Sequence, residues 1–101
     1  MNVRYRLRAL DDVQAIYDWR SRQSTEIAAK IEAAIFAAAE WLGRHPELGT
    51  MTDEGDVRRW PMTDFNYTIF YRTDMRVGEL DVLRIMDARR IRNLQRLPRS
   101  L

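Results

Sequence analysis

The sequence contains no cysteine, so it can form neither a disulfide framework nor a thiolate metal site. No apolar run approaches the roughly 20 residues that a membrane-spanning helix needs. Residues 1–5, Met-Asn-Val-Arg-Tyr, contain no apolar core of a secretory signal peptide. From these absences we expect a soluble cytoplasmic protein that does not contact a membrane.

The groups that hydrolytic or metal chemistry requires are scarce. The single histidine, His45, precedes Pro46 after a predicted helix, and no nucleophile lies at a recognisable spacing from it. The four glycines are too scattered for a phosphate-binding loop. The acid pairs at 11–12 and 53–54 fit a helix start and a loop. We therefore predict no catalytic residue, no metal and no cofactor, and we expect that the protein is not an enzyme.

The chain does contain many arginines, and they are unevenly distributed. With 101 residues, 46% of them hydrophobic, it fits one folded domain over residues 1–101. Residues 1–57 carry seven Lys/Arg and ten Asp/Glu, a balance of −3, whereas residues 58–101 carry ten arginines and five acids, a balance of +5. Arginine suits bidentate pairing with carboxylate or phosphate. The second half could therefore bind an acidic partner or a nucleic acid.

Hydrophobic periodicity predicts an α+β domain. Residues 3–8 alternate, which predicts a half-buried strand with Arg4, Arg6 and Arg8 on one side. A helix should follow from the acids at 11–12 to about Arg22, and a second one should begin at the capping residue Ser24 and stop at Gly43.

The second half predicts an antiparallel three-stranded meander over residues 56–62, 66–73 and 79–86, and a short helix over about 87–94. We expect the helical hairpin to pack on one face of a four-stranded sheet formed by the meander and the N-terminal strand.

Alternation in the middle strand predicts which side chains face the helices. Tyr67, Ile69 and Tyr71 should point to the helices, and Thr68, Phe70 and Arg72 to the open face. In the last strand, Leu83 and Ile85 should lie opposite Arg84. The open face would then carry an array of arginines with Phe70 among them. A register slip of one residue would invert this assignment.

Several of these segments together resemble the RelE/ParE family of toxins from type II toxin–antitoxin systems. They are Pro46-Glu-Leu-Gly49, the pair Arg58-Arg59, Tyr67-Thr-Ile-Phe-Tyr-Arg72 and Leu80-Asp-Val-Leu-Arg-Ile-Met86, and the likeness spans about residues 3–92. The ribonuclease branch of the family usually has an arginine where this chain has Thr68, and it commonly has a C-terminal tyrosine or histidine that is missing here after Asp87. These departures favour the ParE-like branch.

The ParE-like resemblance implies a bacterial inhibitor of DNA gyrase that acts in plasmid maintenance or a stress response. It also implies neutralisation by a cognate antitoxin through an acidic or amphipathic C-terminal segment. The candidates for binding a partner or phosphate are Arg58, Arg59, Phe70, Arg72, Arg84, Arg89 and Arg90.

Two alternatives remain open at this point. One is a RelE-like endoribonuclease that cleaves mRNA at the ribosome, with Arg58, Arg59, Arg72 and Arg84 on phosphate. Since arginine cannot act as a base, only Asp87, Tyr67 and Tyr71 could move protons. The other is a binding module that keeps the fold without toxicity.

Overall fold

The computed structural model describes residues 1–89 of the chain. In chain order the elements are β1 (Asn2–Tyr5), α1 (Leu7–Ser21), α2 (Thr25–Arg44), β2 (Thr50–Met51), β3 (Arg58–Pro61), β4 (Tyr67–Asp74) and β5 (Glu79–Asp87). Neither helix of this part of the chain has the length and apolar character needed to cross a membrane. The predicted C-terminal helix extends past Arg89 and falls mainly outside the described residues, as does the candidate Arg90.

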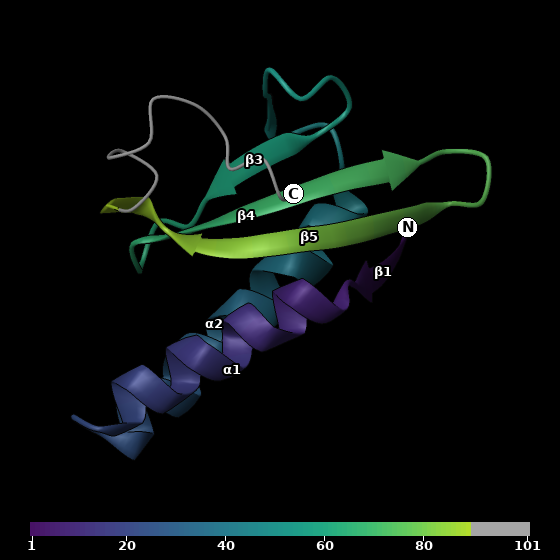
Figure 1. Cartoon of the computed structure of the whole chain (residues 1–101). Helices are drawn as coiled ribbons and strands as arrows, with labels where there is room; N and C mark the ends of the chain where they lie inside the picture. Colours follow the sequence, from purple (N-terminus) through teal and green to yellow (C-terminus); the bar gives the residue numbers. More distant parts are fainter. Residues whose placement is uncertain (90–101) are drawn as a thin grey trace.

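The strands form one sheet in the order β1-β5-β4-β3-β2, and the α1–α2 hairpin lies against one face of it (Figure 1). β1 runs parallel to β5, and the other neighbours are antiparallel. The predicted α+β class and meander are confirmed, but the described sheet has five strands instead of four. The additional strand, β2, is two residues long and pairs with Arg58 and Arg59. A strand this short has no periodic pattern, so we expected only a loop there.

The boundary between β1 and α1 lies earlier than predicted. β1 ends at Tyr5, where the backbone N–H of Arg6 donates to the carbonyl of Val82 at 3.0 Å, and α1 begins at Leu7. The predicted N-terminal strand is present, but its predicted end at Arg8 was wrong, because Arg6 and Arg8 belong to the start of the helix. Arg6 provides no side-chain cap and the first turn contains no acid, so the usual start signals are missing.

The helical hairpin covers the sheet through a common apolar core. Ser24 caps α2 as predicted, because its hydroxyl accepts from the backbone N–H of Ile27 at 3.2 Å. The buried positions of α2 recur at helical spacing and are Ala28, Ile31, Ile35, Ala39 and Leu42. From β4 the core receives the alternate residues Tyr67, Ile69 and Tyr71, which confirms the face predicted for them.

A β-bulge changes the faces of the last strand. Phe70 pairs with Arg84, but the next residue, Tyr71, pairs with Val82, so Leu83 is the extra residue of β5. Leu83 then joins a second cluster with Val57, Phe70 and Met86, while Ile85 stays in the helix-side core. The prediction that Leu83 and Ile85 share a face was wrong for this reason.

The loop after α2 is fastened to the sheet by a tyrosine and an arginine. The Tyr71 hydroxyl donates to the Pro46 carbonyl and accepts from the Gly49 N–H, both at 2.8 Å. Nη1 of Arg58 donates to the Gly49 carbonyl at 2.7 Å and to the Glu47 carbonyl at 3.1 Å. A Cβ at position 49 would meet the Tyr71 ring at 2.7 Å, so only glycine allows this close approach. The segment Pro46–Gly49 and the β4 strand are thus one structural unit.

We expect Tyr71→Phe to lower the free energy of unfolding by about 1–3 kcal/mol, because the buried Gly49 N–H loses its acceptor and the Pro46 carbonyl loses its donor. Urea unfolding followed by circular dichroism measures this loss. Tyr67→Phe is the matched control: it removes only the bond from Nε of the partly exposed Arg20, which water can replace, so its loss should be smaller. Equal losses in the two variants would contradict the fastening role.

Stability should also fall at alkaline pH because of Tyr5, whose ring packs edge-on to Phe36 with centroids 5.3 Å apart. Burial, assisted by the charge of Glu40, raises the pKa of Tyr5 from 10.0 to about 12. The unfolded chain therefore loses this proton at lower pH than the folded chain. The stability that Tyr5 contributes to the folded state is fully present below pH 10.0 and is lost as the pH rises towards about 12. Urea unfolding across that interval should show a shallower decline for Tyr5→Phe than for the wild type.

Candidate functional site

The predicted open arginine array loses two of its members, because Arg58 and Arg84 are bonded within the chain. Arg58 is bonded to the loop carbonyls described above. Arg59 is exposed and lies opposite Phe70 on the face away from the helices. The exposed side chain of Arg89 has Nε 3.6 Å from the Asp87 carboxylate. Whether any of these candidates binds a partner stays a prediction.

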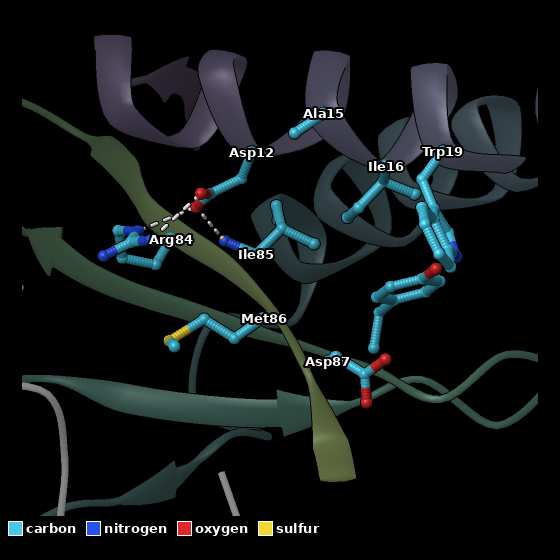
Figure 2. Close-up of a pocket in the computed structure, with 9 residues that line it drawn as sticks. Asp12, Ala15, Ile16, Trp19, Arg84, Ile85, Met86 and Asp87 are labelled. Carbon is cyan, nitrogen blue, oxygen red and sulfur yellow. Dashed lines mark hydrogen bonds and ion pairs between the residues drawn. The ribbon is translucent and has the colours of Figure 1, made fainter. Parts of the chain in front are cut away.

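Arg84 is enclosed by an ion pair with α1 (Figure 2). Its Nε donates to Oδ2 of Asp12 at 2.7 Å and its Nη2 to Oδ1 at 3.0 Å. Only 11% of the Arg84 side chain and 15% of the Asp12 side chain are exposed. The hydrogen bond to Asp12 raises the pKa of Arg84 above its ordinary value, against the lowering effect of burial. The expectation that Arg84 lies on an open surface was therefore wrong.

The same carboxylate also completes the edge of the sheet. Oδ2 of Asp12 accepts from the backbone N–H of Ile85 at 2.9 Å (Figure 2). β1 pairs with β5 only as far as Val82, so the rest of β5 has a strand on one side alone among the described residues. Asp12 supplies an acceptor on the unpaired side. We expected the acids at 11–12 to begin a helix, and nothing in the local sequence indicates this long-range contact.

Phe70 is fully buried. It packs with Val57, Leu83 and Met86 in the second cluster, on the face of the sheet away from the helices. The expectation that Phe70 is exposed among arginines was wrong, because this face has its own apolar core.

One of the predicted residues, Arg72, lines a hollow of about 440 Å³ at the start of α1. We call it the basic hollow; its lining residues are Arg6, Leu7, Arg8, Arg72 and Leu83. Leu7 is 79% exposed and Leu83 is 5% exposed, so one leucine lies in solvent and the other belongs to the second cluster. This grouping was not predicted, because the alternating pattern of residues 3–8 placed Arg6 and Arg8 in a strand.

A smaller cleft of about 210 Å³ lies between α1 and the last residues of β5 (Figure 2). Its apolar walls are Ala15, Ile16 and Trp19 from α1 and Ile85 and Met86 from β5. Trp19 is 60% exposed, and the guanidinium of Arg22 lies 5.4 Å from its ring centroid. Within residues 1–89, no three His, Asp or Glu side chains gather in a way that could hold a metal ion.

Comparison with known proteins decides the family. The model of the ParE toxin of the type II toxin–antitoxin system parDE matches residues 3–92. The chain belongs to this family. It is a ParE-type toxin, as the Tyr67–Arg72 strand and Thr68 indicated.

The structural comparison agrees on the fold. A solved structure of the chromosomal ParDE system from P. aeruginosa superposes with a TM-score of 0.76 at 22% sequence identity, covering 86% of this chain and 95% of that one. No curated protein sequence matches the chain.

We expect Asp12→Ala to destabilise this toxin by about 3 kcal/mol, because it leaves the Arg84 guanidinium buried without its partner and removes the acceptor of the Ile85 N–H. Arg84→Ala should have a comparable effect. The control is Lys30→Ala in the exposed Lys30–Glu26 pair, which should change stability by less than about 0.5 kcal/mol. Urea unfolding measures all three, and a loss for Asp12→Ala as small as that of the control would show that the contact is not structural.

Proposed function

We propose that this ParE-type toxin inhibits DNA gyrase in the cytoplasm and is neutralised by a cognate antitoxin. The match of the ParE family model over residues 3–92 carries this proposal. The sequence departures from the ribonuclease branch support it, namely Thr68 and the lack of a tyrosine or histidine after Asp87. A role in plasmid maintenance or a stress response would follow from the same target.

The positions of the four arginines that a ribonuclease would place on phosphate also support an inhibitor over the RelE-like alternative. Arg58 is bonded to the loop after α2, and Arg84 is paired with Asp12. Of the other two, Arg59 is exposed opposite Phe70, and Nε of Arg72 lies 3.6 Å from Oδ2 of Asp56.

The two tyrosines that could move protons are engaged as well. The hydroxyl of Tyr71 is hydrogen-bonded to the Pro46 carbonyl and the Gly49 N–H, and burial raises the pKa of Tyr71 above its ordinary value of 10.0. The hydroxyl of Tyr67 accepts from Nε of Arg20 at 2.9 Å. A tyrosine with a raised pKa is a poorer base near neutral pH. The engagement of both tyrosines supports a toxin that acts by binding over one that cleaves RNA.

A supercoiling assay tests the proposed target directly. The purified toxin should stop purified gyrase from supercoiling relaxed plasmid, and the antitoxin added in excess should restore activity. The surface variant Arg76→Gln, whose side chain is 91% exposed on the β4–β5 turn, serves as a control and should inhibit as the wild type does.

Inducible expression in bacteria separates the alternatives. Gyrase inhibition predicts replication arrest and an SOS response, with mRNA intact. Rapid mRNA cleavage at ribosomes, with gyrase unaffected in the purified assay, would replace the proposal by the RelE-like activity. Normal growth at full expression would favour a non-toxic binding module.

A further inference from the structure

The sheet face that lies away from the helices is buried, although neither α1 nor α2 lies on it. We call it the outer face; its buried residues are Val57, Phe70, Leu83 and Met86 of the second cluster and, by alternation in β4, Thr68, each at most 5% exposed. α1 and α2 pack against the opposite face (Figure 1). Apolar side chains on a sheet become shielded from water when a further layer of protein covers them. The burial of the outer face therefore requires a covering segment.

The neighbours of Phe70 within the sheet do not supply this cover. Phe70 pairs with Arg59 of β3 and with Arg84 of β5. Arg59 is exposed, and the Arg84 guanidinium is turned to Asp12 at the edge of the sheet (Figure 2). The cleft and the basic hollow place α1 beside β5, but Phe70 lines neither of them. Since Phe70 is fully buried within a single chain, the covering segment belongs to the same chain.

We propose that residues 90–101 pack on the outer face and close it. Ala88 and Arg89, the last described residues, are helical and follow directly on β5, whose Met86 belongs to the second cluster. The segment thus starts at the border of the surface that it covers. The second cluster spans the width of three neighbouring strands, about 10 Å. As a helix, residues 90–101 would be about 18 Å long, which is enough to cross it.

The composition of the segment fits this surface. Ile91, Leu94 and Leu97 recur at every third position, a spacing that gathers apolar side chains on one side of a helix. That side matches the apolar second cluster. The remaining residues of the segment include four arginines and no acid, and the loop before Val57 carries exposed acids at positions 53, 54 and 56. The charges of the segment and of this loop are therefore complementary.

A nitroxide label on the outer face tests the packing in the full-length chain. The sequence contains no cysteine, so Arg59→Cys places the label at one exposed site opposite Phe70. The amide NMR signals of residues 90–101 should lose most of their intensity through paramagnetic broadening. Lys30→Cys is the matched control, because this exposed residue of α2 lies on the helix side of the sheet. With the label there, the same signals should keep their intensity.

Thermal melts of two variants within the segment give a second measurement. Leu94→Asp should lower the Tm by about 5 °C or more, because it places a charge against the second cluster. It should also increase the fluorescence of the dye ANS, which binds uncovered apolar surface. Gln95→Asp adds the same charge outside the apolar spacing and should lower the Tm by less than about 2 °C.

Each outcome supports or overturns the inference. If the label at position 59 leaves the signals of residues 90–101 intact, or if Leu94→Asp melts together with Gln95→Asp, the segment does not cover the outer face. Mixing nitroxide-labelled protein with isotope-enriched protein that carries no label separates copies: broadening in this mixture would show that a second copy is the cover, and would overturn the inference. The gyrase assay tests a different property, so the proposed function and this inference stand or fail independently.

Discussion

The contact between the Asp12 carboxylate and the β5 edge holds the two layers of this toxin together. β1 is too short to pair with all of β5, so the outer strand would otherwise expose unpaired backbone groups beside the helix. A single carboxylate accepts from the Ile85 N–H and from the Arg84 guanidinium at once. The helix is thereby attached to the sheet by polar bonds as well as by the apolar core. Removing either partner of such a buried pair costs more than an exposed ion pair contributes.

The β-bulge opposite Phe70 and Tyr71 determines which side chains of β5 face away from the helices. It gives the sheet an apolar cluster on the face away from the helices, in which Phe70 is buried, and the basic hollow lies near the start of α1. Some arginines near this cluster are bonded to other parts of the chain, and others are exposed to solvent. Arg58 and Arg84 hold parts of the chain in place, whereas Arg6 is 58% exposed on its side chain and Arg72 39%.

Local sequence patterns predicted the elements well where the relevant signal lies within a few residues. Ser24 caps α2 through the nearby Ile27, and the alternation in β4 places Tyr67, Ile69 and Tyr71 against the helices. The start of α1 was not predictable, because the alternating pattern of β1 continues across Leu7 and no capping side chain marks the change. The resemblance to the RelE/ParE family was correct and came from segments that the fold brings together, such as Pro46–Gly49 and Tyr71.

The candidate site was less predictable than the fold because it depends on contacts across the whole chain. The Asp12–Arg84 pair joins residues 72 positions apart, and the bulge that redirects Leu83 leaves no mark in the sequence. Among the sequence-derived candidates that fall within residues 1–89, Arg72 alone lines the basic hollow. Its other arginines, Arg6 and Arg8, had been noticed but were assigned to a strand.

The parallel pairing of β1 with β5 has a consequence for how the toxin matures on the ribosome. β1 pairs with residues 79–82 of β5, and Asp12 can form its ion pair only after Arg84 has been synthesised. The earliest-made strand therefore has no neighbour in the sheet until almost all of the described chain has emerged. Contacts of such wide sequence separation form slowly. A translation product interrupted before residue 79 would leave β1 and α1 without the strand on which they pack.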